Sequence, residues 1–141
     1  MGMDQRMLYL ALMVVPPLLS TLLCVILTFD WLGFTREVPV IRTPAEFHRF
    51  QRMASRSMYG AIVVLIALVI SLGASAVGRA TEALSRSDIA YLLLTAGVQI
   101  AVGLSTRGIE RRARETPAEP NLQQQREYVA HVWEKEMLPK W

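Results

Sequence analysis

Residues 58–78 read Met-Tyr-Gly-Ala-Ile-Val-Val-Leu-Ile-Ala-Leu-Val-Ile-Ser-Leu-Gly-Ala-Ser-Ala-Val-Gly and contain no charged side chain. A helix needs roughly 20 apolar residues to cross a bilayer core about 30 Å thick. The segment 61–70 is solidly apolar and lacks the alternation of a membrane β-barrel strand. Because lipid offers no partner to open backbone groups, this stretch predicts a transmembrane helix.

Two further uncharged stretches have the same character, residues 7–29 and 89–106. The chain has 52% hydrophobic residues and a net charge of +3. Soluble domains contain a similar share of apolar residues, so it is the clustering of these residues in long uncharged stretches that excludes an ordinary soluble domain. The first stretch is longer than the apolar core of a signal peptide, which is about 7–15 residues, so we expect it to be retained. The predicted fold is an all-α integral membrane protein with three transmembrane helices, at about 7–29, 58–78 and 89–106.

This reading divides the chain into four parts. Residues 1–29 hold the first transmembrane helix, 30–57 a basic connection with a helix, 58–106 a transmembrane hairpin, and 107–141 a tail with an amphipathic helix. Thr43, Pro44 and Glu46 form a capping-box pattern, which predicts one helix from about 44 to 79.

Local signals set the remaining expectations. Residues 36–39 read as extended, and Asn121 is the expected N-cap of a last helix at about 122–138. The pair Pro16-Pro17 lies inside the first span and predicts a kink or local unwinding there.

Lys and Arg near the span ends indicate the orientation, because cytoplasmic loops carry an excess of them. The connection and the start of the tail carry nine: Arg36, Arg42, Arg49, Arg52, Arg56, Arg107, Arg111, Arg112 and Arg114. The opposite side carries three: Arg6, Arg79 and Arg86. The sequence therefore predicts an N-terminus outside, a cytoplasmic tail, and a bacterial inner membrane as the location.

No pattern indicates catalysis. His48 and His131 lie outside the spans without further ligand residues at metal-site spacing. No predicted span holds an Asp, Glu, Lys or Arg, the residues on which proton relays and ion-coupled transport depend. We therefore expect no catalytic residue, no metal and no cofactor of its own, and no enzyme activity. Contacts to pigment, quinone or lipid held by partners remain open.

Small residues in the second and third spans allow close helix packing. The candidate packing residues are Gly73, Ala74, Gly78, Gly97, Gln99 and Ala101. The two spans could pack on each other through them, or they could form a face for another subunit. Gln99 could hydrogen-bond near Ser71 or Ser75 within the chain, or reach a partner helix or ligand.

Two further surfaces are candidate contact sites. Anionic lipid or an acidic partner could bind the basic residues Arg49, Arg52, Arg56, Arg107, Arg111, Arg112 and Arg114. The last helix would dock on lipid or on another protein through Tyr128, Val129, Val132, Trp133, Met137 and Trp141. Nucleic acid is not an expected partner.

These features favour a non-catalytic accessory subunit of a larger inner-membrane complex, with a respiratory or photosynthetic electron-transfer assembly as the expected host. Its partners would be other integral membrane subunits and membrane lipids. One alternative is a self-assembling channel or scaffold of identical chains. Another is a membrane-bound regulator or assembly factor that acts through the tail.

Overall fold

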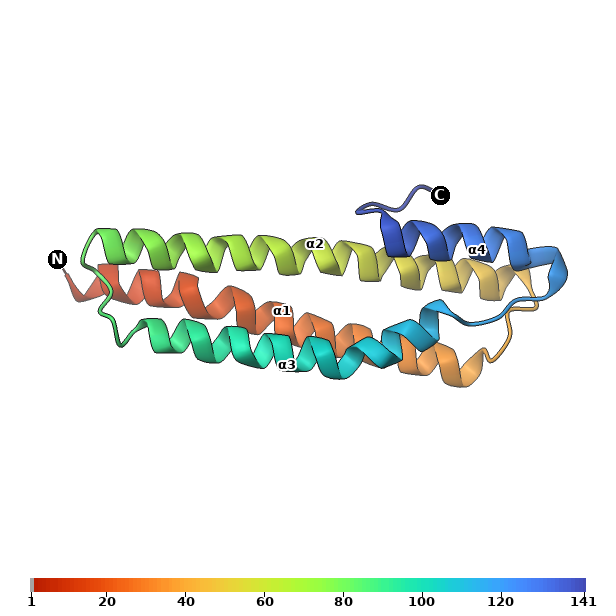
Figure 1. The fold of residues 1–141 in the computed structure, drawn as a ribbon, viewed down its shortest axis with the longest axis horizontal. Coiled ribbons are helices and arrows are strands. Elements are labelled where there is room, and N and C mark those ends of the chain that lie inside the picture. The colour runs from red at the N-terminus through yellow and green to blue at the C-terminus, as the bar shows by residue number, and fades with distance from the viewer. Residues whose placement is uncertain (1) are drawn as a thin grey trace. The chain divides into compact units, whose positions relative to one another are not determined.

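A computed structural model describes residues 2–141 as four helices, with no strand among them. The helices are α1 (Met3–Glu37), α2 (Pro44–Ala80), α3 (Ile89–Arg114) and α4 (Pro120–Lys135) (Figure 1). The first three are long and apolar enough to cross a membrane. The prediction of an all-helical protein with three candidate membrane spans is confirmed.

The start of α2 follows the predicted capping box. The Glu46 amide donates to Thr43 Oγ1 at 3.2 Å, and Glu46 Oε2 accepts from the Thr43 amide at 3.2 Å. These reciprocal bonds satisfy two N–H groups that a helix start leaves open. With no breaker behind it, α2 continues to Ala80 as one helix, as predicted.

Other boundaries differ from expectation. Helix α1 includes Arg36 and Glu37, which were expected to be extended. Helix α4 begins at Pro120 behind Glu119, which makes no side-chain capping bond, so the prediction of Asn121 as the cap is wrong. Proline suits the first helical position because its φ angle is already helical and no N–H is needed there. The helix ends at Lys135 rather than near 138.

Helical structure continues without a break through Pro16-Pro17, so the expected local unwinding is absent. Pro17 lacks an N–H and cannot bond the carbonyl oxygen of Met13 four residues earlier. In the structure that oxygen accepts a hydrogen bond from Ser71 Oγ of α2. A donor from a neighbouring helix thus replaces the missing backbone donor, and the helix is preserved.

The contacts divide the chain into two units. Unit 1 comprises residues 1–24 and 63–104. Its described core is a small apolar cluster of Met13, Leu84 and Leu92, with Tyr9, Leu10 and Val14 packed against it. The loop between α2 and α3 contributes to this core, because Leu84 is only 1% exposed.

Unit 2 comprises residues 25–62 and 105–141. Its core contains the aromatic rings of Phe34 from α1, Phe50 from α2 and Trp133 from α4, with ring centroids 5.9 and 6.0 Å apart in successive pairs. Figure 1 shows α4 beside the first part of α2, where these contacts lie. The Ile41 amide donates to the Pro117 carbonyl at 2.8 Å, which ties the connection after α1 to the segment before α4.

Candidate functional site

A chain of hydrogen bonds joins two of the apolar helices in unit 1. Gln99 Nε2 of α3 donates to Ser20 Oγ of α1 at 2.9 Å, and Ser20 Oγ donates to the Pro17 carbonyl at 3.0 Å. Gln99 therefore bonds within its own chain, to α1 rather than to the serines of α2 that the sequence suggested. Ser20 and Ser71 are 2% and 0% exposed, so these polar groups are used internally.

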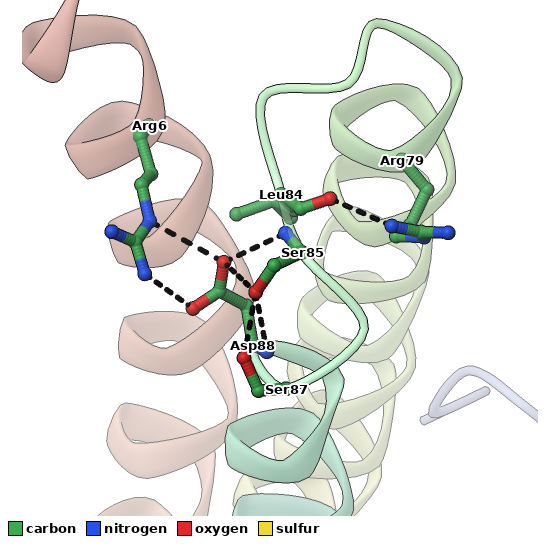
Figure 2. A network of polar contacts seen from close by, with 6 residues as sticks. All are labelled: Arg6, Arg79, Leu84, Ser85, Ser87 and Asp88. Carbon is green, nitrogen blue, oxygen red and sulfur yellow. Dashed lines mark hydrogen bonds and ion pairs between the residues drawn. The ribbon is translucent and has the colours of Figure 1, made fainter.

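A second polar cluster closes unit 1 at the loop before α3 (Figure 2). Arg6 donates to both carboxylate oxygens of Asp88, at 2.8 and 3.3 Å. The Ser85 amide donates to Asp88 Oδ2 at 2.8 Å, and the Asp88 amide donates to Ser85 Oγ. The Arg6 hydrogen bonds, and then the Ser85 amide, lower the pKa of Asp88 to about 2.

The structure buries some of the candidate packing residues and leaves others exposed. Ala74 and Gly78 are buried. A Cβ atom at Gly78 would stand 2.5 Å from Leu84 Cδ1, so this glycine permits a close approach within the chain. Gly73, Gly97 and Ala101 are exposed, and a Cβ at either glycine would meet no atom within 4 Å.

Three of the candidate basic residues line one cavity of about 170 Å³ in unit 2. Its lining residues are Asp30, Phe34, Arg49, Arg52, Met53 and Arg56. Arg49 forms an ion pair with Glu37 and lies 5.7 Å from the Phe34 ring centroid. Arg56 lies 3.6 Å from Asp30 Oδ2. The arrangement concentrates positive charge after the uncharged stretch of α1 and before that of α2.

The second basic group lies along a larger cleft of about 840 Å³ between the end of α3 and α4. Arg107, Arg111 and Arg114 line this cleft together with glutamates such as Glu110 and Glu134, whereas Arg112 is not among its lining residues. Because both signs of charge face the cleft, its field differs from that of a simple anion site.

The candidate docking residues of the tail separate into inner and outer groups. Val129, Val132 and Trp133 are buried inside unit 2, so the chain itself covers them. Tyr128 and Met137 are 51% and 65% exposed. Trp141 is 38% exposed, and its Nε1 donates to Ser55 Oγ of α2 at 3.0 Å.

Sequence reasoning missed several residues that hold this structure together. The ion pair of Arg6 and Asp88 joins charges 82 residues apart, although both flank predicted spans. Trp31 Nε1 donates to the buried Ser57 Oγ at 2.7 Å. In each case the available signal was a polar or charged side chain at the edge of an apolar stretch, but no pattern in the sequence names its partner.

Within residues 2–141, no three or more His, Cys, Asp or Glu side chains lie close enough together to hold a metal ion. Comparison with known proteins gives no match to any family model, any curated protein or any solved structure.

Proposed function

We propose that the chain is a non-catalytic accessory subunit of a larger membrane complex in a bacterial inner membrane. The observation that supports this proposal best is the open surface at Gly73 of α2 and Gly97 of α3. Glycine allows the backbones of two membrane helices to approach closely. At Gly78 the chain itself packs closely, with side-chain atoms of Leu84 and Tyr9 next to the glycine. Gly73 and Gly97 are left uncovered within the described residues, which favours packing against helices of another subunit.

The hydrogen bonds within the chain support the same proposal. Gln99, Ser20 and Ser71 bond to groups of this chain, and large apolar side chains such as Leu93 and Phe29 are 68% and 69% exposed. An outer surface of this kind suits lipid and apolar partner helices. A respiratory or photosynthetic electron-transfer assembly is the proposed host, with any pigment or quinone held by its other subunits.

The proposed topology has the N-terminus outside and the tail in the cytoplasm, by the excess of Arg in the connection and at the end of α3. The side of α4 that bears Tyr128, together with Met137 and Trp141, would then dock on the cytoplasmic face of the complex or on its lipid. Val129, Val132 and Trp133 support this surface from inside unit 2.

The test begins with tagged protein solubilised from native membranes in a mild detergent. The purified material is run on a native gel, and its band is analysed by mass spectrometry and absorption spectroscopy. We expect a large band with stoichiometric partners, and haem, chlorophyll or flavin absorption would identify the process. A small band that holds this chain alone contradicts the proposal.

Matched variants show whether the open glycines form the interface. Gly73→Leu and Gly97→Leu fill the open positions, and we expect both to release the chain from the complex. Val69→Leu is the control, because Val69 is 63% exposed on α2 and already carries a branched side chain. Equal retention of all three variants in the complex would contradict this interface.

A self-assembling scaffold or channel is the second candidate, because the same open glycines could receive helices of identical chains. The native gel separates the two functions. A multimer that contains only this chain, and that dissociates into smaller species when Gly73 is replaced by Leu, would favour self-assembly over an accessory role.

A further inference from the structure

The cavity lined by Asp30, Arg49, Arg52 and Arg56 lies at a defined level of the chain. Asp30 is the first charged residue after the uncharged stretch 7–29, and Arg56 is the last before the uncharged stretch 58–78. Both stretches belong to candidate membrane spans. The cavity is therefore placed where the phosphate groups of a leaflet meet the protein.

The charges around this cavity do not cancel. Arg49 is paired with Glu37, and Arg56 with Asp30. The side chain of Arg52 makes no hydrogen bond or ion pair within residues 2–141, the part of the chain that the structure describes. Three guanidinium groups against two carboxylates leave one positive charge, which resides on Arg52. A ligand with a single negative charge would neutralise it.

Asp30 supplies the second feature. Its side chain is 31% exposed and lines the cavity. Its Oδ2 is buried and receives no hydrogen bond from the part of the chain that is described, since Arg56 at 3.6 Å is too distant. A buried acceptor without a donor carries a desolvation cost. The carboxylate would therefore gain from a hydroxyl donor on a ligand.

We propose that this cavity binds the headgroup of one phospholipid with a single negative charge and a free hydroxyl, as in phosphatidylglycerol. The phosphate would lie against Arg52, flanked by Arg49 and Arg56, and a headgroup hydroxyl would donate to Asp30. The acyl chains would follow the exposed apolar side chains of α1 and α2. This proposal is independent of which complex contains the chain.

Charge and donor chemistry disfavour the other common headgroups. Phosphatidylethanolamine and phosphatidylcholine carry no net charge, so neither would neutralise Arg52, and phosphatidylcholine also has no donor for Asp30. A phosphate monoester brings a second negative charge towards the Asp30 carboxylate. The cavity therefore selects for a phosphodiester that carries a hydroxyl.

Native mass spectrometry of the full chain in detergent tests the proposal with three added lipids of equal acyl chains. We expect phosphatidylglycerol to bind best, phosphatidylmethanol, which is anionic without a hydroxyl, to bind less, and phosphatidylcholine least. Excess inorganic phosphate should not displace the bound lipid. Equal binding of the three lipids, or displacement by phosphate, would overturn the proposal.

Variants then locate the site. Arg52→Gln should weaken phosphatidylglycerol binding about five-fold, the effect of about 1 kcal/mol per basic residue at an anionic surface. Arg36→Gln removes the same charge from exposed Arg36 outside the cavity and should change binding less than two-fold. Circular dichroism checks that both variants keep their helices. If both variants lost the same amount of phosphatidylglycerol binding, the effect of Arg52 would be that of any positive charge on the protein, and the proposal would be overturned.

Asp30→Asn tests the hydroxyl contact separately. The variant keeps the shape of the side chain and replaces the charged carboxylate acceptor by the weaker, neutral acceptor of an amide. We expect the preference for phosphatidylglycerol over phosphatidylmethanol to shrink while phosphatidylmethanol still binds. An unchanged preference would show that Asp30 does not accept a hydrogen bond from the headgroup hydroxyl, and it would overturn that part of the proposal.

Discussion

Asp88 is the residue that joins the start of α1 to the loop before α3 in unit 1. Its side chain is 2% exposed and accepts hydrogen bonds from Arg6 and from the Ser85 amide. The folded pKa of about 2 lies below the value near 3.9 of an unfolded aspartate. The unfolded chain thus takes up the proton first, and this contribution to stability is present above pH 4 and lost as the pH falls towards 2.

We therefore expect the thermal stability of the protein in detergent, followed by circular dichroism, to fall more steeply below pH 4 in the wild type than in Asp88→Asn. The variant should be less stable at pH 7 because it lacks the charged partner of Arg6. Parallel curves for the two proteins between pH 4 and pH 2 would contradict this role of Asp88.

Gly78 and Gly73 allow a paired test of two glycines in one helix. At Gly78 a Cβ would lie 2.5 and 2.7 Å from two atoms of Leu84, which is buried against Met13 and Leu92. Overpacking costs about 1–3 kcal/mol, whereas alanine gains about 1 kcal/mol over glycine in a helix. Gly78→Ala should therefore lower the free energy of unfolding.

At Gly73 no atom lies within 4 Å of the added carbon, so Gly73→Ala should raise that free energy by up to about 1 kcal/mol. Denaturant titration of both purified variants measures the two values. The same sign of change in both would show that the close approach at Gly78 is not as described.

At the scale of elements, the proline pair in α1 depends on α2. Ser71→Ala removes the side-chain donor to the Met13 carbonyl, which Pro17 cannot replace. Hydrogen bonds between membrane helices contribute about 0.6–2 kcal/mol, and we expect a loss of this size in the free energy of unfolding.

A double-mutant cycle isolates this effect. Pro17→Ala restores a backbone N–H that can reach the Met13 carbonyl, so Ser71→Ala should cost much less in that background. Additive effects of the two substitutions would mean that Ser71 does not compensate for the proline.

The tail helix α4 is held by its buried side. Trp133 is 7% exposed and its ring lies 6.0 Å from that of Phe50, whereas Met137 is 65% exposed. Large-to-small changes of buried aromatic residues cost about 3–5 kcal/mol. Trp133→Ala should therefore destabilise unit 2 by about this amount, and Met137→Ala should change stability by less than about 0.5 kcal/mol. Chemical denaturation with tyrosine fluorescence compares them, and similar losses would contradict the docking of α4.

Local signals predicted the elements better than their partners. The capping box at Thr43 and Glu46 gave the start of α2 because its bonds span three residues. The uncharged stretches predicted the spans because about 20 consecutive apolar residues are enough for a helix to cross a bilayer core. The prediction of Asn121 as the N-cap was wrong because Pro120 fits the first helical turn without a side-chain cap. The bonds of Gln99 to Ser20 and of Arg6 to Asp88 join distant helices, and no periodicity in the sequence fixes such pairs.

At the scale of the whole molecule, the distribution of charge is the basis of the predicted orientation. The connection after α1 and the end of α3 carry most of the arginines that flank the spans. Part of this charge is internally paired, as in Arg49 with Glu37 and Arg111 with Glu115. The orientation rule counts Lys and Arg rather than net charge, so these pairs do not weaken the expected direction of insertion.

The predicted orientation can be measured with single cysteines in a Cys24→Ser background, because Cys24 is the only native cysteine. Gly2→Cys and Lys140→Cys place one thiol near each end, at exposed positions. A membrane-impermeant maleimide should label Gly2→Cys in cells with a permeable outer envelope, and Lys140→Cys only after the inner membrane is disrupted. Both labels depend on the positive-inside excess. Replacing Arg107, Arg111 and Arg112 by Gln leaves six of the nine basic residues on one side against three on the other, so this variant should keep the labelling pattern of the wild type. Labelling of Lys140→Cys in intact cells would reverse the topology and place the lipid cavity at Asp30 in the outer leaflet.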